Sequence, residues 1–264
     1  MNRPRILDLF CCEGGASVGY HRAGFDVFGV DMFQYVDKDG KRRGYTRARY
    51  PFVSLQSDAV LALVRLLAGE SLLFTGPDGT QWLMKLSDFD AIAASPPCQA
   101  YSITKHSHNS EHPDLVGPVR WLLRQAGLPY VMENVPGAPL ETPLTLCGAE
   151  FDLTAQDDDG RTLHLKRHRL FESNLFLTGL GGCQCTAYKR RGIGVGGAYG
   201  GGSVDRTHAK EVRRGGYTPG KHVREALLGI DWMTQNGLSQ SIPPAYTEHL
   251  GRQVLAHLGL EVAA

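Results

Sequence analysis

Three observations predict an α/β fold with a mostly parallel sheet. Residues 6–31 read as a strand, a glycine-bearing turn, a helix and a second strand, which together make a βαβ unit. Two later apolar runs, residues 90–95 and 129–132, are followed by a proline pair and by a polar Glu-Asn pair, as expected at the ends of buried strands. The 264 residues with 42% hydrophobic content are enough for one sizeable core.

The βαβ unit predicts a nucleoside site. Residues 6–10 form the first strand, residues 11–15 the turn, residues 16–23 a helix that Gly24 ends, and residues 25–31 the second strand. Asp31 lies at the tip of that strand, where its carboxylate can accept hydrogen bonds from both ribose hydroxyls. The three-glycine dinucleotide fingerprint is missing, so a nucleoside without a pyrophosphate fits better. The alternative is an ordinary α/β turn.

A second signal is the segment Ser95-Pro96-Pro97-Cys98-Gln99, which ends the next apolar run. Two prolines cannot continue a strand ladder, so Cys98 is expected at a strand end, facing a cleft. A thiol in that place suits attack on a carbon that is too electron-poor to react until a thiolate has added next to it, as with C5 of cytosine. The alternative is a buried structural cysteine.

In these segments and in several others, the chain resembles the cytosine-C5 DNA methyltransferase family. The resembling motifs follow the family's order and span residues 5–173 and 221–258. They are Asp8-Leu9-Phe10 through Gly14-Gly15, Asp31, Ser57-Asp58-Ala59, Pro96-Pro97-Cys98-Gln99, Glu133-Asn134-Val135, Arg167-His168-Arg169 and Gln240-Ser241-Ile242-Pro243-Pro244.

The resemblance implies a Rossmann-like class I methyltransferase fold with a small inserted recognition region. It assigns residues 1–173 and 223–264 to a catalytic and cofactor-binding domain, and residues 174–222 to target recognition. It also implies S-adenosylmethionine as cofactor. The residues expected to bind it are Phe10, Gly14, Gly15, Asp31, Met32, Asp58, Ala59, Pro97, Gln240 and Ile242.

The implied catalytic residues are Cys98, Glu133, Arg167 and Arg169. Cys98 would add to C6 of cytosine, and Glu133 would donate to N3, so we expect burial to raise the pKa of Glu133. Arg169 would hold the base O2, and Arg167 would brace the loop or a phosphate. Alternatively, Glu133 is a structural ion-pair partner and the arginines belong to a solvated strand face.

Three positions depart from the family pattern. Cys12 stands where glycine is usual and the backbone must approach the cofactor, which leaves the donor less certain. Leu165 replaces a glutamine two positions before the first arginine, and Gln240 replaces an asparagine. None of the three touches the nucleophile or the glutamate.

The segment between the last two motifs is basic and rich in glycine. From Tyr188 to Arg224 there are nine Lys and Arg against two acids, a local balance of +7, although the whole chain carries only +1. This favours contacts with phosphates and groove edges of double-stranded DNA. The alternative is a disordered basic linker. The predicted DNA-binding residues are Lys105, in a polar lid over residues 99–114, together with Arg190, Arg191, Arg213 and Arg214.

Metal sites have weaker sequence support. The lid histidines are irregularly spaced, and Cys183 and Cys185 would need His208 and His222 to complete a zinc site. A Cys-x-Cys pair alone is poor evidence for ligands, so we expect no metal.

The remaining features point to an intracellular, cytoplasmic or nucleoid-associated monomer. There is no apolar run of membrane length and no signal sequence, and the six cysteines form no disulfide framework. Residues 72–84 predict a hairpin. Three alternatives stay open: an RNA cytosine-C5 methyltransferase, a catalytically silent DNA-binding relative, and transfer of a modified one-carbon group.

Overall fold

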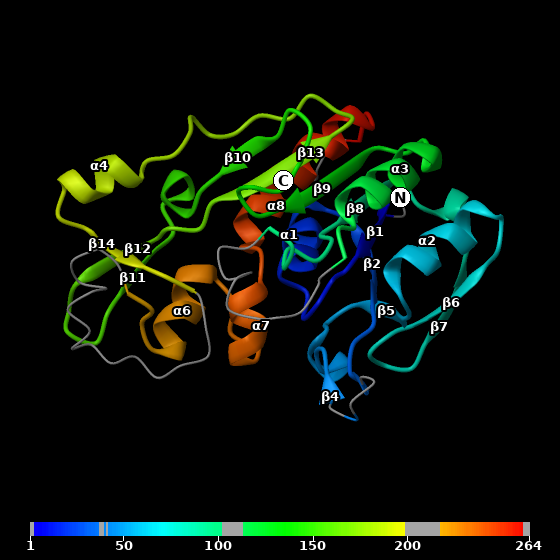
Figure 1. The fold of residues 1–264 in the computed structure, drawn as a ribbon, viewed down its shortest axis with the longest axis horizontal. Helices are drawn as coiled ribbons and strands as arrows, with labels where there is room; N and C mark the ends of the chain where they lie inside the picture. The colour runs from blue at the N-terminus through cyan, green and yellow to red at the C-terminus, as the bar shows by residue number, and fades with distance from the viewer. Residues whose placement is uncertain (1–2, 37–39, 41, 102–112, 199–216, 261–264) are drawn as a thin grey trace.

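A nine-stranded sheet forms the centre of the protein in the computed structural model, which describes residues 3–36, 40, 42–101, 113–198 and 217–260. The strand order is β10-β13-β9-β8-β1-β2-β5-β6-β7 (Figure 1). The five central strands run parallel, and antiparallel strands extend the sheet at both edges. The predicted α/β fold with a mostly parallel sheet is therefore confirmed. Its strands are β1 (Arg5–Leu9), β2 (Asp26–Asp31), β5 (Val53–Gln56), β6 (Leu72–Thr75), β7 (Gln81–Met84), β8 (Ala91–Ala94), β9 (Tyr130–Asn134), β10 (Leu144–Leu146) and β13 (Arg169–Ser173).

Helices cover both faces of this sheet. Side chains alternate along each strand, so Ile6 of β1 packs towards one face and its neighbour Leu7 towards the other. The Ile6 face is covered by α1 and α8, which pack on each other, and the Leu7 face by α2 and α3. The helices are α1 (Gly15–Ala23), α2 (Ala59–Leu67), α3 (Val116–Ala126) and α8 (Pro244–His257).

Local signals explain where these elements begin and end. The predicted βαβ unit is confirmed as β1, α1 and β2, with Gly24 at φ 126° just after the end of α1. Asp58 caps α2, because its Oδ1 accepts the Leu61 N–H at 2.9 Å. The predicted hairpin is confirmed as β6 paired antiparallel with β7.

A separate three-stranded sheet lies at one end of the molecule (Figure 1). It takes β11 and β12 from before residue 174 and β14 from after it, and α6 packs against β11 and β12. The division at residue 174 into catalytic and recognition regions remains a prediction. The elements here are β11 (Thr154–Gln156), β12 (Thr162–Leu165), β14 (Gly194–Gly196), α4 (Cys185–Arg190), α6 (Lys221–Leu228) and α7 (Gln235–Gln240).

The other short elements lie in the connections of the main sheet. A two-stranded ribbon follows β2, and three 3₁₀ turns lie farther along the described part of the chain. These are β3 (Tyr35–Val36), β4 (Arg42–Arg43), η1 (Arg47–Arg49), η2 (Leu86–Asp88) and η4 (Gly148–Phe151). Among the residues that the structure describes, no helix has the length and apolar character needed to span a membrane.

Candidate functional site

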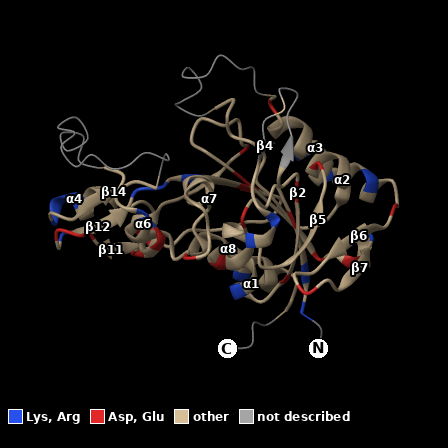
Figure 2. Ribbon diagram, turned by 90° about the horizontal axis from the view of Figure 1, so that it is seen from below, with Lys and Arg blue, Asp and Glu red and all other residues tan. Residues whose placement is uncertain are grey.

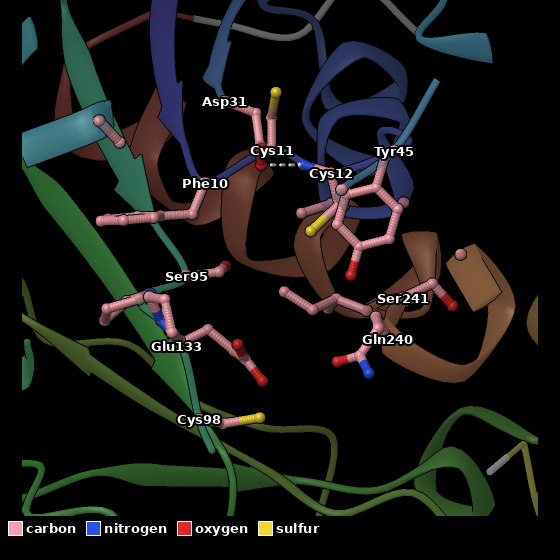
Figure 3. A pocket seen from close by; sticks show the side chains of 18 of the residues that line it. Phe10, Cys11, Cys12, Asp31, Tyr45, Ser95, Cys98, Glu133, Gln240 and Ser241 are labelled. Carbon is pink, nitrogen blue, oxygen red and sulfur yellow. Dashed lines mark hydrogen bonds between the residues drawn. The ribbon is translucent and has the colours of Figure 1, made fainter. Parts of the chain in front are cut away.

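One cavity of about 360 Å³ lies at the carboxyl ends of the parallel strands (Figure 3). This edge of an open α/β sheet is the usual place for ligands, because the loops that follow the strands converge there. Phe10 follows β1, Asp31 ends β2, the Ser95–Cys98 segment follows β8, and Glu133 lies near the end of β9. The fold thus brings the predicted cofactor and catalytic segments to one cavity.

The turn after β1 is closed by the carboxylate of Asp31. Asp31 Oδ2 accepts the Cys12 N–H at 2.9 Å, drawn as a dashed line in Figure 3, and Oδ1 accepts the Phe33 N–H at 3.1 Å. Burial raises the pKa of Asp31, while these backbone donors lower it. A carboxylate has about four acceptor positions, so each oxygen keeps capacity for a ligand hydroxyl.

Cys12 occupies this turn with φ 51°, in the left-handed region that glycine enters most easily. That explains why a glycine suits the position and shows that this chain accepts a side chain there. Tyr45 lies with Cys12 on the cavity wall, and its hydroxyl lowers the pKa of the Cys12 thiol. Burial and the charge of Asp31 raise the pKa of Cys12, so it stays a protonated thiol at neutral pH.

Glu13 fastens the distant helix α7 to the same turn. Its two carboxylate oxygens accept the Thr234 N–H at 2.7 Å and the Thr234 hydroxyl at 2.8 Å. Gly237 lies so close that a Cβ there would be 2.2 Å from Glu13 Oε2. This contact places Gln240, at the end of α7, on the cavity wall.

Cys98, on the turn after β8, and Glu133, in the neighbouring strand β9, project into the cavity (Figure 3). The Pro-Pro turn that carries Cys98 is held to β9 by a hydrogen bond from Asn134 Nδ2 to the Pro96 carbonyl at 3.0 Å. Glu133 Oε1 lies 2.9 Å from Arg169 Nε, and the side chains of this pair are 11% and 8% exposed.

Burial has the largest effect on the pKa values of Glu133 and Cys98. It raises the pKa of Glu133, the direction expected from the sequence, while Arg169 and Arg167 lower it. Burial also raises the pKa of the Cys98 thiol, followed by the negative charge of Glu133, and the positive charge of Arg169 lowers it. Protonation of Glu133 therefore removes one of the charges that oppose formation of the Cys98 thiolate.

Arg167 lies outside the cavity, unlike its partner Arg169. It is fully buried and donates to the carbonyl of Ala198 at 3.2 Å and to that of Ser239 at 2.8 Å. These bonds join the end of β12 to α7 and to the chain after β14. Leu165, one of the departures from the family pattern, is a buried residue of the hydrophobic core that β12 forms with α6 and α7.

Most of the predicted cofactor residues line the cavity, and Gly14 is the exception. Gly14 instead caps α1 with φ 89°. Gly15 lines the cavity, and a Cβ there would lie 2.7 Å from the Ile242 carbonyl, so glycine allows α1 to approach the last motif. The cavity includes Phe10, Gly15, Asp31, Met32, Asp58, Ala59, Pro97, Gln240 and Ile242.

Sequence reasoning missed several cavity residues. Tyr45 comes from the insert after β2, and Met233 and Asn236 come from the segment that Glu13 holds. No spacing in the sequence links these positions to residues 10–15. Only the Gly14-Gly15 and Gly237 positions, where the chain comes close to itself, offered a signal.

The predicted DNA-binding residues are only partly visible. Arg190 and Arg191 lie exposed at and just after the end of α4, and Figure 2 shows Lys and Arg at this helix. Arg191 also stacks on the Tyr188 ring, 5.5 Å from its centroid. Arg224 is buried in α6, so it adds nothing to a basic surface. Lys105, Arg213 and Arg214, and most of the predicted lid, lie outside the described residues.

Comparisons with known proteins place the fold. No family model and no curated protein matches the chain. Among solved structures, a protein described as a candidate DNA modification methyltransferase from an E. coli prophage aligns over 97% of this chain and 99% of its own, at 14% identity and a TM-score of 0.52.

Two other full-length alignments are looser. Dnmt2 methyltransferase of S. pombe covers 98% of this chain and 100% of its own, at 10% identity and TM-score 0.49. The methyltransferase EhMeth of Entamoeba histolytica covers 98% and 99%, at 10% identity and TM-score 0.42. The alignment with the prophage protein, described as a candidate DNA modification methyltransferase, shows that this chain has the same α/β fold over nearly its whole length.

Proposed function

We propose that this protein is a DNA cytosine-C5 methyltransferase that uses S-adenosylmethionine. The observation that carries the proposal is the shared cavity of Cys98, the buried Glu133–Arg169 pair and the Asp31 carboxylate. A nucleophile, a proton donor and a ribose acceptor then face one space. The description of the prophage protein supports DNA as the substrate.

The cavity residues fit S-adenosylmethionine. The volume of the cavity lies within the range of about 300–1,000 Å³ that is usual for small-molecule sites. Asp31 would accept the ribose hydroxyls, Asp58 would meet the adenine amino group, and Phe10 and Ile242 provide apolar walls. When bound, the cofactor would supply an electrophilic methyl group for C5.

The chain's own residues would act on the cytosine ring. The Cys98 sulfur forms a bond to C6, and Glu133, in its protonated form, donates to N3 so that negative charge does not build up on the ring. Arg169 holds Glu133 in place and presents its guanidinium to the base O2. Loss of the C5 proton to an acceptor in the cavity, and departure of the Cys98 sulfur, complete the exchange.

Arg167 has a different role in this proposal. Because it is buried and bonded to backbone carbonyls, it braces the site instead of contacting the base or a phosphate. Cytosine C5 and C6 are stacked inside a duplex, so the target must be flipped into the cavity. Residues 174–222 are proposed to read the target, and the exposed Arg190 and Arg191 to contact its phosphates.

A duplex that contains 5-fluorocytosine tests the mechanism. Fluorine at C5 cannot leave as a proton, so wild-type protein with S-adenosylmethionine should form an adduct that survives denaturation. Cys98→Ala should form none and should still bind the duplex. If wild-type protein forms no adduct with any fluorinated substrate, or if Cys98→Ala still methylates, the covalent mechanism is wrong.

The same assay separates the alternatives. A fluorinated tRNA that is trapped while duplex DNA is not would identify an RNA cytosine-C5 methyltransferase. Duplex binding without turnover would identify a catalytically silent relative. Mass spectrometry of the product nucleoside reports the group transferred, and 5-methylcytosine is expected despite Cys12.

A further inference from the structure

Four thiol and imidazole side chains meet at the junction between the two sheets. The ligand atoms of Cys147, His168, Cys183 and Cys185 all lie within 4.8 Å of one another. Cys147 Sγ is 3.3 Å from Cys185 Sγ, and His168 Nε2 is 3.1 Å from Cys183 Sγ. None of the four lines the cavity that holds Cys98 and Asp31.

From this geometry we propose that the four residues bind one structural zinc ion. Three thiolates and one imidazole are an established zinc donor set. With Zn–S bonds of about 2.3 Å, sulfur atoms at the corners of a tetrahedron lie about 3.8 Å apart. The two closest pairs, at 3.3 and 3.1 Å, are shorter than that value, and all four ligand atoms lie within 4.8 Å, so small outward side-chain shifts would make room for the ion.

The main sheet supplies half of the site through its strand register. β10 pairs antiparallel with β13, and Leu146 lies opposite Arg169. Continuing this register by one residue sets Cys147 opposite His168. Cys147 and His168, which are 21 positions apart in the sequence, are therefore neighbours at the end of the β10–β13 pair, at the edge of the main sheet. Cys147 is buried and His168 is half-buried.

A loop shaped by glycines delivers the other half. Gly181 and Gly182 have φ of 122° and 88°, which lets the chain turn before Cys183. The carboxylate of Glu150 holds this turn, because its Oε1 accepts the Leu180 N–H at 2.6 Å and the Gly182 N–H at 3.0 Å. The Cys185 N–H points to Cys183 Sγ at 3.5 Å, a contact that stabilises a metal-bound thiolate.

This assignment differs from the sequence-based one. The expected absence of a metal is revised, and so is the partner set considered for Cys183 and Cys185. His222 Nε2 lies 2.7 Å from Asp158 Oδ1 instead, and His208 is outside the described residues. The two partners found here lie before the Cys-x-Cys pair in the chain, not after it.

The metal would link α4 to the edge of the nine-stranded sheet. Cys185 begins α4, which carries the exposed Arg190, and Tyr188 of the same helix packs on Cys147. His168 lies between Arg167 and Arg169, so the same ion would also fix the strand that presents Arg169 to Glu133. A structural zinc site of this kind contributes directly to folding stability.

Metal content of the full chain tests the proposal. Protein purified without chelators should contain about one zinc per chain by mass spectrometry of the elements. Reduced protein stripped of metal should bind one cobalt(II) with the absorption of a tetrahedral three-thiolate site. Absence of both signals would overturn the proposal, as would a disulfide between Cys147 and Cys185 in peptides from unreduced protein.

Variants assign the ligands. Cys183→Ser is the first choice because Cys183 is exposed, so this substitution removes a ligand without disturbing buried packing. Changes outside the first coordination shell already cost about 10- to 100-fold in metal affinity, so this variant should bind zinc at least tenfold more weakly against a chromogenic chelator. Cys98→Ala also removes one thiol and should bind zinc as the wild type does. Equal affinity in Cys183→Ser and wild type would refute the assignment.

Discussion

Removal of the Asp31 carboxylate should weaken cofactor binding by a predictable amount. In Asp31→Ala the ribose loses one or two hydrogen bonds to a charged acceptor, about 2–3 kcal/mol in total. This corresponds to roughly 30- to 150-fold in Kd. The variant also leaves the Cys12 and Phe33 N–H groups without their acceptor, which should lower the free energy of unfolding by about 1–3 kcal/mol.

The two effects can be measured separately. Titration calorimetry with S-adenosylmethionine gives the Kd, and urea unfolding without ligand gives the stability. Asp31→Asn should fall between Asp31→Ala and wild type, because its amide keeps one acceptor oxygen but loses the charge. Asp26→Asn is the matched control, since Asp26 begins the same strand at the end away from the cavity.

One outcome would refute the reasoning. If Asp31→Ala is folded and binds S-adenosylmethionine with the wild-type Kd, the ribose contact lies elsewhere. A Kd that rises equally in the Asp26→Asn control would instead trace the loss to the strand as a whole.

Three further predictions follow from the site. The negative charge of Glu133 raises the pKa of Cys98, and the positive charge of Arg169 lowers it. Glu133→Gln should therefore move the pH midpoint of Cys98 alkylation by iodoacetamide to lower pH, and Arg169→Gln should move it to higher pH. A shift of either midpoint in the opposite direction would contradict the charge assignment. Cys12→Gly should change the free energy of unfolding by less than about 1 kcal/mol, because glycine relieves the left-handed φ but gains freedom in the unfolded chain. Calorimetry should find the Kd of this variant for S-adenosylmethionine within a few-fold of wild type. A large loss of affinity would mean that the Cys12 thiol takes part in binding. The proposed recognition region of fewer than fifty residues offers few side chains that could contact base edges. Bisulfite sequencing of DNA from a methylase-deficient host that expresses the protein should therefore reveal a recognition site of about two to four base pairs. A fully specified site of six or more base pairs would require base-contacting residues outside residues 174–222.

Local chemistry was enough for much of the fold and for the centre of the site. The apolar runs and the helical spacing within residues 6–31, and the stop at Gly24, are short-range signals, and the structure reproduces them as β1, α1 and β2. Cys98 and Glu133 each end an apolar run, and parallel strands end at the same edge of a sheet. Their convergence on one cavity could therefore be predicted without coordinates.

Only the tertiary structure decided which distant residues meet. Glu13 holds α7 across more than two hundred positions, and Arg167 turns into the core while Arg169, two residues on, reaches Glu133. Likewise, the partners of Cys183 and Cys185 depend on the antiparallel register that sets Cys147 opposite His168. Strand pairing and helix packing are set by the burial of whole faces, so neither the spacing of these residues nor their type reveals which of them come together.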